Sequence, residues 1–150
     1  MEIILHPNKI LREKTQKVEK IDKEIKELIK EMKRIMIQNK GVGLAANQIG
    51  KNLSLFIAYD NKKFYTFINP EIVKFFGEEK IMEEGCLSVP RAWGQIKRYE
   101  GVVISYQDLF GKKKKLKTKG LLAQIIQHEI DHLNGILFID KAITIYRLNE

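Results

Sequence analysis

The sequence of 150 residues has little that would direct it to a membrane or an oxidising compartment. It contains one cysteine, which excludes an intramolecular disulfide framework and is typical of a reducing compartment. No apolar run reaches the roughly 18 residues that a membrane span requires, and residues 1–5 lack the pattern of a secretory signal. Repeats, low-complexity segments and interdomain linkers are also lacking. We therefore expect one cytoplasmic globular domain over residues 1–150.

Acidic residues are too few to balance the basic ones. The chain has 27 Lys and Arg against 19 Asp and Glu, a net charge of +8. The densest basic run, residues 112–115, follows a turn at 108–111, so we expect these lysines on a solvated hairpin arm. Clustered arginines with stacking aromatics, which nucleic-acid sites usually carry, are lacking. The charge is therefore weak evidence for a partner, and we expect no membrane partner and no specific nucleic-acid partner.

Two segments have the apolar periodicity of helices. Residues 22–38 are amphipathic, with Asp22 as the expected N-cap. Residues 119–134 form the second helix, with Gly135 at its C-terminal end. On a helical wheel, Leu121, Ile125, His128 and His132 lie within about 60° of one another. The helical wheel places Gln124, Gln127, Asp131 and Asn134 on the opposite side.

The middle of the chain is rich in β-branched and aromatic residues. We expect strands at 53–59 and 64–68, the second closed by Asn69-Pro70, then at 71–76 and 80–83. A hairpin around Gly111 would join 101–108 to 114–118. These antiparallel turns predict an α+β fold. Antiparallel β-sheets would pack around a central C-terminal helix, and the amphipathic helix would lie near the N-terminus.

The second helix contains the sequence His-Glu-Ile-Asp-His at residues 128–132. Residues four apart lie on one helix face, so His128 and His132 can reach a single metal ion. Glu129 lies about 100° further around the helix, close enough to contact a water on that ion. The alternative is two partly buried histidines with ordinary hydrogen bonds and a surface glutamate. It does not explain why the motif lies in register on a buried helix. We interpret this sequence as the metal-binding part of a hydrolase.

A catalytic site of this kind normally has three protein ligands and an open position. The downstream glutamate of thermolysin-like proteases has no counterpart except the terminal Glu150, and Phe138 stands where metzincins carry a third histidine. His6 has no partner pattern of its own. Cys86 is the strongest remaining candidate, and the zinc deaminases are excluded because they need a second cysteine.

Three segments together carry a resemblance to a known family. They are GVGLAANQ at residues 41–48, EGCLS at 84–88 and QHEIDH at 127–132. The glycines of the first segment do not meet the requirements of a dinucleotide or P-loop motif, and we expect a turn there that lets another chain approach closely. The order and spacing of the three segments resemble those of the peptide deformylases, and the likeness extends to about Asp140.

The resemblance implies an enzyme that removes the formyl group from N-formylmethionine at the start of new proteins. One divalent ion, Fe(II) by expectation and Zn(II), Ni(II) or Co(II) as substitutes, would be held by Cys86, His128 and His132. Glu129 would transfer the proton of the attacking water to the amine. The Gln48 amide and the Leu87 backbone N–H would stabilise the oxyanion.

The resemblance also implies how a formylated nascent peptide binds. Gly43 and Gly85 would pair with its backbone. Val42, Leu121 and Ile125 would form the methionine pocket, although Ile125 is equally well explained as a core residue. We further expect support from an Arg98–Glu84 contact. The partners implied are formylated nascent peptides and, transiently, the ribosome, with the protein itself a monomer.

Two features depart from the family. Trp93 occupies an expected loop position where many relatives carry a polar or basic residue. The chain also ends ten residues after Asp140, without the long C-terminal helix that can dock members on the ribosome.

Three other functions remain open on the residues alone. A small metalloendopeptidase would use the same helix. A basic RNA- or ribosome-binding module would have a structural metal with four protein ligands. A thiol hydrolase would use Cys86 as its nucleophile.

Overall fold

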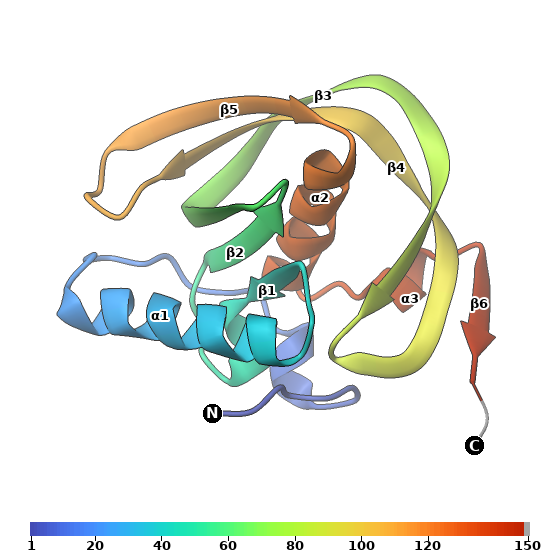
Figure 1. Ribbon diagram of the computed structural model, residues 1–150, viewed down its shortest axis with the longest axis horizontal. Coiled ribbons are helices and arrows are strands. Elements are labelled where there is room, and N and C mark those ends of the chain that lie inside the picture. Colours follow the sequence, from blue (N-terminus) through green and yellow to red (C-terminus); the bar gives the residue numbers. More distant parts are fainter. Residues whose placement is uncertain (149–150) are drawn as a thin grey trace.

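A computed structural model describes residues 1–148, which form three α-helices, two 3₁₀-helices and six strands. In chain order, the elements are η1 (Lys9–Arg12), α1 (Lys23–Gln38), β1 (Gly43–Ala45), η2 (Ala46–Ile49), β2 (Leu55–Asp60), β3 (Lys63–Cys86), β4 (Val89–Gln107), β5 (Lys113–Lys119), α2 (Leu121–Leu133), α3 (Phe138–Lys141) and β6 (Thr144–Arg147). The helix α2 lies near the middle of the molecule, with β3, β4 and β5 curving over it and α1 on the other side of β1 and β2 (Figure 1). None of the helices in this part of the chain is long and apolar enough to cross a membrane.

The described strands pair antiparallel in one six-stranded sheet of order β1-β2-β3-β4-β5, with β6 paired to β4. The predicted α+β class and antiparallel pairing are therefore confirmed, with one continuous sheet in place of several. The hairpin around Gly111 is also confirmed, since β4 and β5 pair from Gln107 and Lys113 to Gly101 and Lys119.

The prediction that Asn69-Pro70 closes a strand is wrong. The strand β3 continues through this point, and the pairing with β4 shifts register between Ile68 and Glu71. Asn69 has a positive φ of 50°, and Pro70 has no N–H to place in a ladder, so both residues suit a bulge. The Asn69 side chain stabilises the bulge by hydrogen bonds with Val18 and with Gln107.

The N-terminal helix begins where the sequence predicts. The Asp22 side chain accepts a hydrogen bond from the Ile25 N–H at 3.1 Å, which caps the first turn. The apolar face of the helix is buried against β1 and β2, in a core that includes Met32, Ile35 and Leu44. This packing positions the segment 41–48, which leads from the helix into the site.

The segment 41–48 is more regular than the predicted turn. It contains the short strand β1, which pairs with β2, and the 3₁₀-helix η2. Backbone pairing of Gly43 with Ala58 is a contact distant in sequence, so local glycine content does not reveal it. As a result, Gln48 is held in η2 with its side chain buried (1% exposed).

The helix α2 is buried more completely than its pattern suggests. Leu122, Ala123 and Ile126 pack against the sheet, but the polar side is covered as well. Gln127 exchanges hydrogen bonds with the backbone of Tyr99 on β4, and Asp131 is 8% exposed. The strand β4 covers this face, because it is 19 residues long and bends around the helix.

Gly135 ends the helix as predicted. Its φ is +75°, a conformation that favours glycine, and a Cβ there would lie 2.5 Å from the Arg12 carbonyl oxygen. The elements that follow, α3 and β6, were not predicted. Trp93, expected in a loop, lies in β4 opposite Tyr146 of β6, with ring centroids 6.4 Å apart.

Candidate metal centre and its pocket

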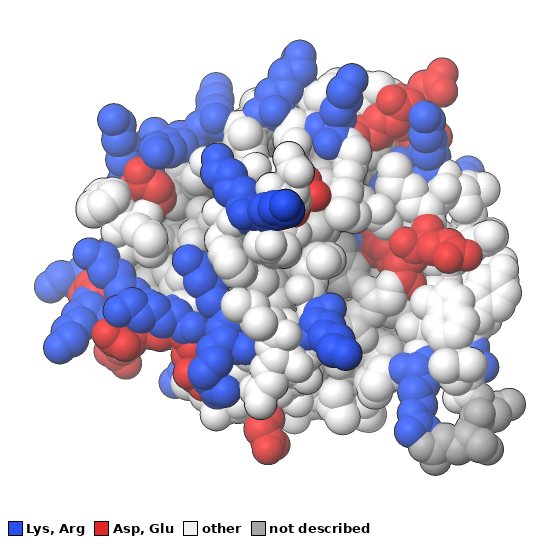
Figure 2. All heavy atoms as spheres, viewed as in Figure 1, with Lys and Arg blue, Asp and Glu red and all other residues white. Residues whose placement is uncertain are grey.

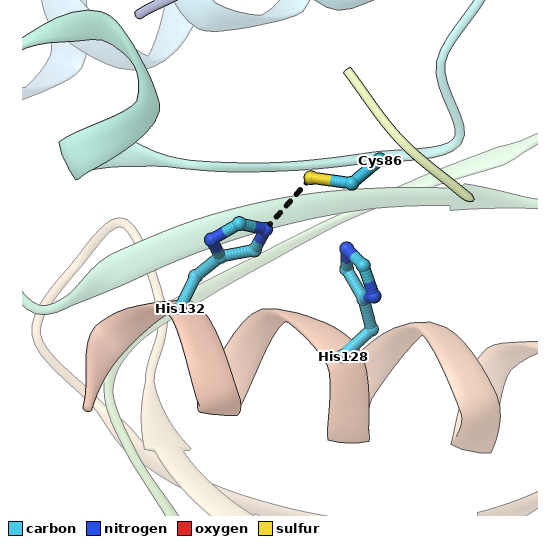
Figure 3. Close-up of side chains that lie close together, drawn as sticks. All are labelled: Cys86, His128 and His132. Atoms are coloured by element: carbon cyan, nitrogen blue, oxygen red, sulfur yellow. Dashed lines mark hydrogen bonds between the residues drawn. The ribbon is translucent and has the colours of Figure 1, made fainter. Parts of the chain in front are cut away.

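Two elements bring the three predicted metal ligands together. The histidines lie one turn apart on α2, with ring centroids 4.9 Å apart, and Cys86 is the last residue of β3. Figure 3 shows the cysteine sulfur facing the His132 ring and the His128 ring beside them. The Cys86 Sγ lies 3.2 Å from the His132 Nε2, and the three ligand atoms lie within 4.8 Å of one another.

This donor set fits a transition-metal ion. One thiolate and two imidazoles suit Fe(II) or Zn(II), and three protein ligands leave a position open. Metal–ligand bonds of about 2.0–2.3 Å put ligand atoms roughly 3.5 Å apart, so a small closure of the group would complete the site. Burial lowers the pKa of His132 well below its usual value, which favours the neutral imidazole that binds metals. Glu150, the rejected alternative ligand, lies outside the described residues.

A chain of buried charges holds the His128 ring. Its Nδ1 lies 2.8 Å from Glu84 Oε1, which leaves Nε2 on the side of the ligand group. Arg98 donates to both Glu84 oxygens, at 2.7 and 2.8 Å, and to Asp131 at 2.7 Å. Lys141 completes the chain with a 3.0 Å contact to Asp131. The predicted Arg98–Glu84 contact is therefore present, while Asp131 and Lys141 were not predicted.

The charge state of Glu84 follows from these contacts. Burial alone would raise the pKa of its carboxyl, but hydrogen bonds from Arg98 and His128 lower the pKa to about 2. Glu84 is therefore ionised at neutral pH. An ionised carboxylate on Nδ1 fixes the tautomer and the orientation of a metal-binding histidine.

Glu129 is a buried carboxyl without a hydrogen-bond partner on one of its oxygens. The residue is 3% exposed, and its Oε1 has no partner within the part of the chain that the structure describes. Burial raises the pKa of the Glu129 carboxyl to about 7, against the lowering effect of nearby His128. A carboxyl with this pKa can both accept and donate a proton at neutral pH.

Gln48 is held beside the cysteine by the residues around it. Its Oε1 accepts from the Ala45 N–H at 2.9 Å, so its Nε2 points the other way, to Ser88 Oγ at 3.0 Å and Cys86 Sγ at 3.6 Å. Sequence reasoning did not select Ser88, although it lies in the EGCLS segment.

Asn47 was also not selected. It donates to the His132 carbonyl at 2.7 Å and ties η2 to the end of α2.

The ligand group lies beside a pocket of about 380 Å³. Its lining includes ten of the eleven predicted site residues: Val42, Gly43, Gln48, Gly85, Cys86, Leu87, Leu121, Ile125, His128 and Glu129. The eleventh, His132, is fully buried. Val42 and Leu121 are exposed at the rim (45% and 51%), whereas Ile125 is 5% exposed. All these residues are therefore in one place, as a common site requires.

The two predicted backbone-pairing glycines differ in what surrounds them. A Cβ at position 43 would lie 2.5 Å from Glu129 Oε2 and 2.9 Å from the Ile125 side chain, so a larger residue there would displace both side chains. A Cβ at position 85 would make only ordinary contacts, 3.5 Å or longer, within the chain. Gly85 is thus explained better by something that approaches from outside.

A buried helix with two histidines and a glutamate, a cysteine beside them and a pocket in front define the class of metal-dependent hydrolases. The sequence profile described as polypeptide deformylase matches residues 1–147. The chain belongs to this family, whose members remove the N-formyl group from newly synthesised proteins and depend on a metal ion.

Individual relatives agree with the profile. A peptide deformylase of Dictyoglomus turgidum is 47% identical over 143 residues, covering 95% of this chain and 93% of the relative. One of Borreliella burgdorferi is 44% identical over 142 residues, covering 93% and 86%. A crystal structure from Synechococcus elongatus, in complex with actinonin, has a TM-score of 0.94 at 37% identity, covering 96% of this chain and 79% of that one. One from Thermotoga maritima has a TM-score of 0.93 at 35% identity, covering 95% and 97%.

Proposed function

We propose that this deformylase hydrolyses the formyl amide of N-formylmethionyl peptides with Glu129 as the proton carrier and with Cys86, His128 and His132 as the ligands of one Fe(II) ion. The observation that carries the proposal is the grouping of the three ligand atoms within 4.8 Å of one another, beside a pocket that Cys86, His128 and Glu129 line. When bound, a divalent ion supplies Lewis acidity, which lowers the pKa of a water toward neutrality and polarises a carbonyl.

The residues of the chain supply the proton transfer. Glu129 takes a proton from the attacking water as its oxygen adds to the formyl carbon. The bond between this carbon and the amide nitrogen then breaks, and Glu129 gives the proton to the departing amine. Formate and a free methionine amine are the products. The raised pKa of Glu129, about 7, suits both steps.

Two donors serve the formyl oxygen as negative charge develops on it. The Gln48 Nε2 lies on the cysteine side of the pocket, held there by the Ala45–Oε1 hydrogen bond. The second donor is the backbone N–H of Leu87. This residue follows Cys86 in the chain and lines the same pocket. Preorganised donors of this kind contribute about 3 kcal/mol each to transition-state stabilisation.

The peptide binds as an added strand beside β1, which is an edge strand of the sheet. Gly43 pairs with the peptide backbone from one side and Gly85 from the other. The methionine side chain is held by Val42, Leu121 and Ile125. The protein acts as a cytoplasmic monomer on nascent chains, in transient contact with the ribosome.

Formate release tests the proposal. The protein is purified without air, its metal content is measured, and it is incubated with formyl-Met-Ala-Ser and with an internally cleavable peptide. We expect iron in a near-equimolar amount, formate from the first peptide, and no cleavage of the second. Zn(II), Ni(II) and Co(II) substitutions show whether Fe(II) is the most active metal.

The rival functions give different results in the same experiment. Internal cleavage without formate would indicate an endopeptidase. A structural metal with no turnover would indicate a binding module. Loss of activity to iodoacetamide, with metal bound and Cys86 covalently labelled, would indicate a thiol nucleophile. Any of these results contradicts the proposal.

A further inference from the structure

A second hollow, larger than the metal pocket, lies on another part of the molecule. Its volume is about 1160 Å³, and it is bordered by the segment after η1, by β3, β4 and β5, and by the last turn of α2. Ile130, Leu133 and Asn134 of α2 line it, whereas the metal pocket uses Leu121 to Glu129 of the same helix. The two linings share no described residue, so the second hollow, which we call the lysine groove, is separate from the catalytic site.

The lysine groove is strongly basic. Five lysines line it, and Glu71 is the one acidic residue among its described lining residues; the lysines are Lys14, Lys17, Lys113, Lys114 and Lys115. Only Lys114 has an ion pair among residues 1–148, at 3.4 Å to Asp108. Figure 2 shows basic side chains along the β5 side of the molecule, whereas over α1 basic and acidic side chains are mixed. The groove therefore concentrates positive charge that the protein itself does not neutralise.

The floor of the groove is built from fixed polar and aromatic groups. The Asn69 side chain bonds to both the N–H and the carbonyl of Val18 and to Gln107, at 2.7 to 2.9 Å. These bonds join the N-terminal segment to β3 and β4. Tyr106 and Phe75 also line the groove, and Phe75 is 46% exposed. One face of the Phe75 ring stacks on Tyr99, with ring centroids 4.6 Å apart, and the rest of this exposed ring lies among lysines. Aromatic rings and lysines together bind the bases and phosphates of a single strand.

Edge-strand protection does not account for this arrangement. Lysines on β5 discourage pairing with other sheets, because β5 lies at the edge of the strand order. Lys14 and Lys17, however, lie on a different segment that is not part of the sheet and still face the same groove. Two separate segments therefore contribute positive charge to the lysine groove. An extended, negatively charged ligand that contacts both segments would explain this arrangement.

We propose that the lysine groove binds single-stranded nucleic acid through its phosphates, without preference for sequence. The lysines contact the backbone, and the exposed face of Phe75 offers a surface on which a base can stack. Groups arranged to read base edges are not needed, in agreement with the expectation of no specific nucleic-acid partner. The proposal does not depend on the proposed catalytic roles, because the two sites are separate.

Fluorescence anisotropy with a labelled oligouridylate of about 20 nucleotides tests the proposal. The full chain should bind it, and the affinity should fall steeply with KCl concentration. Replacing three groove lysines (Lys14→Gln, Lys17→Gln and Lys115→Gln) should raise the Kd roughly 10-fold at about 100 mM KCl. The slope of log K against log salt should decrease by about 2, since each phosphate contact on a single strand contributes about 0.7.

A matched triple variant distinguishes the effect of the groove lysines from the effect of the protein's net positive charge. Lys23→Gln, Lys30→Gln and Lys97→Gln remove the same charge from exposed positions outside the groove, and the Kd should stay within about 2-fold of the unchanged protein. Equal weakening by both triple variants would overturn the proposal, as would tighter binding of a duplex or of inorganic polyphosphate than of the single strand. Formate release by both variants should equal that of the unchanged protein, and circular dichroism checks that each is folded.

Discussion

Glu129 combines burial, a raised pKa and a position beside the proposed metal ligands. The substitution Glu129→Gln keeps the size of the side chain and its neighbours, but the amide cannot carry the proton. We expect metal content to remain unchanged and kcat for formyl-Met-Ala-Ser to fall about 10²- to 10⁴-fold. Parallel metal analysis and formate assays measure both quantities.

The control for this prediction is Glu27→Gln on α1, which removes one exposed carboxylate outside the pocket and should leave both quantities unchanged. If Glu129→Gln kept more than about a tenth of the activity, Glu129 would not be the proton carrier. A loss of metal together with activity would instead assign it to the support of the ligand group.

At the scale of single elements, α1 depends on its cap for the start of the helix. Removing the Asp22 carboxylate by Asp22→Ala leaves the Ile25 N–H without its 3.1 Å partner. We expect the free energy of unfolding to fall by about 1 kcal/mol. Urea denaturation followed by circular dichroism measures this change.

Asp22→Asn restores an acceptor at the same position and should recover most of the lost stability. Formate release at 25 °C should be unchanged in both variants, because α1 lies behind β1 and contributes no described residue to the pocket lining. Equal stability of the alanine and asparagine variants would show that the cap does not stabilise the helix.

Contacts between elements depend on the buried charges around Arg98. This residue is 4% exposed and joins Glu84 on β3 to Asp131 on α2. Replacing it by methionine leaves two buried carboxylates without their shared partner, so we expect a loss of about 3–5 kcal/mol in the free energy of unfolding. The matched control is Lys80→Met, which breaks the exposed pair with Glu100 and should cost less than about 1 kcal/mol.

The same Arg98 variant affects the metal site through Glu84. Without Arg98 the Glu84 carboxylate is held less firmly against His128, and metal affinity should decrease about 10- to 100-fold. Competition with a chromophoric chelator measures the affinity. A stability loss with unchanged metal affinity would show that Arg98 supports the fold alone.

The elements differ in how far the sequence predicts them. The helices α1 and α2 follow from local periodicity, and their observed ends lie within two residues of the predicted ones. The strand β3 does not, because residues 69–70 have the chemistry of a turn and only the pairing with β4 carries the strand through them. Likewise Asp131 resembles a surface residue until β4 is seen to cover it. Contacts that are distant in sequence leave no local pattern.

In the site, too, features set by local sequence were predictable and features set by distant contacts were not. His128 and His132 are brought together by helix geometry alone, and the structure adds that Cys86 reaches them from β3. Ser88 and Asn47 could not be selected, since nothing in their local sequence shows that one meets Gln48 and the other the end of α2. Lys14 and Lys17 belong to no sequence motif, and only the fold places them in the same groove as the lysines of β5.

At the scale of the whole molecule, we expect the metal ion to link the strand β3 to the helix α2. Cys86 is the last residue of β3 and the histidines lie on α2, so an ion bound to all three would join these two elements. The unfolded chain cannot hold the three ligands together, and binding therefore stabilises the folded state. At a free metal concentration about 1,000 times the Kd, the gain is about 4 kcal/mol.

This coupling predicts the effect of metal removal. Treatment with a chelator should lower the Tm by roughly 8–16 °C, given about 2–4 °C per kcal/mol for a protein of this size. Differential scanning fluorimetry measures the shift, and returning Fe(II) without air should reverse it. Cys86→Ser supplies a weaker ligand, so its metal-dependent shift should be much smaller, while its metal-free Tm should lie close to that of the metal-free parent. Equal shifts in the parent and the Cys86 variant would mean that the ion is held by other residues, and the link between β3 and α2 through the metal would then be wrong.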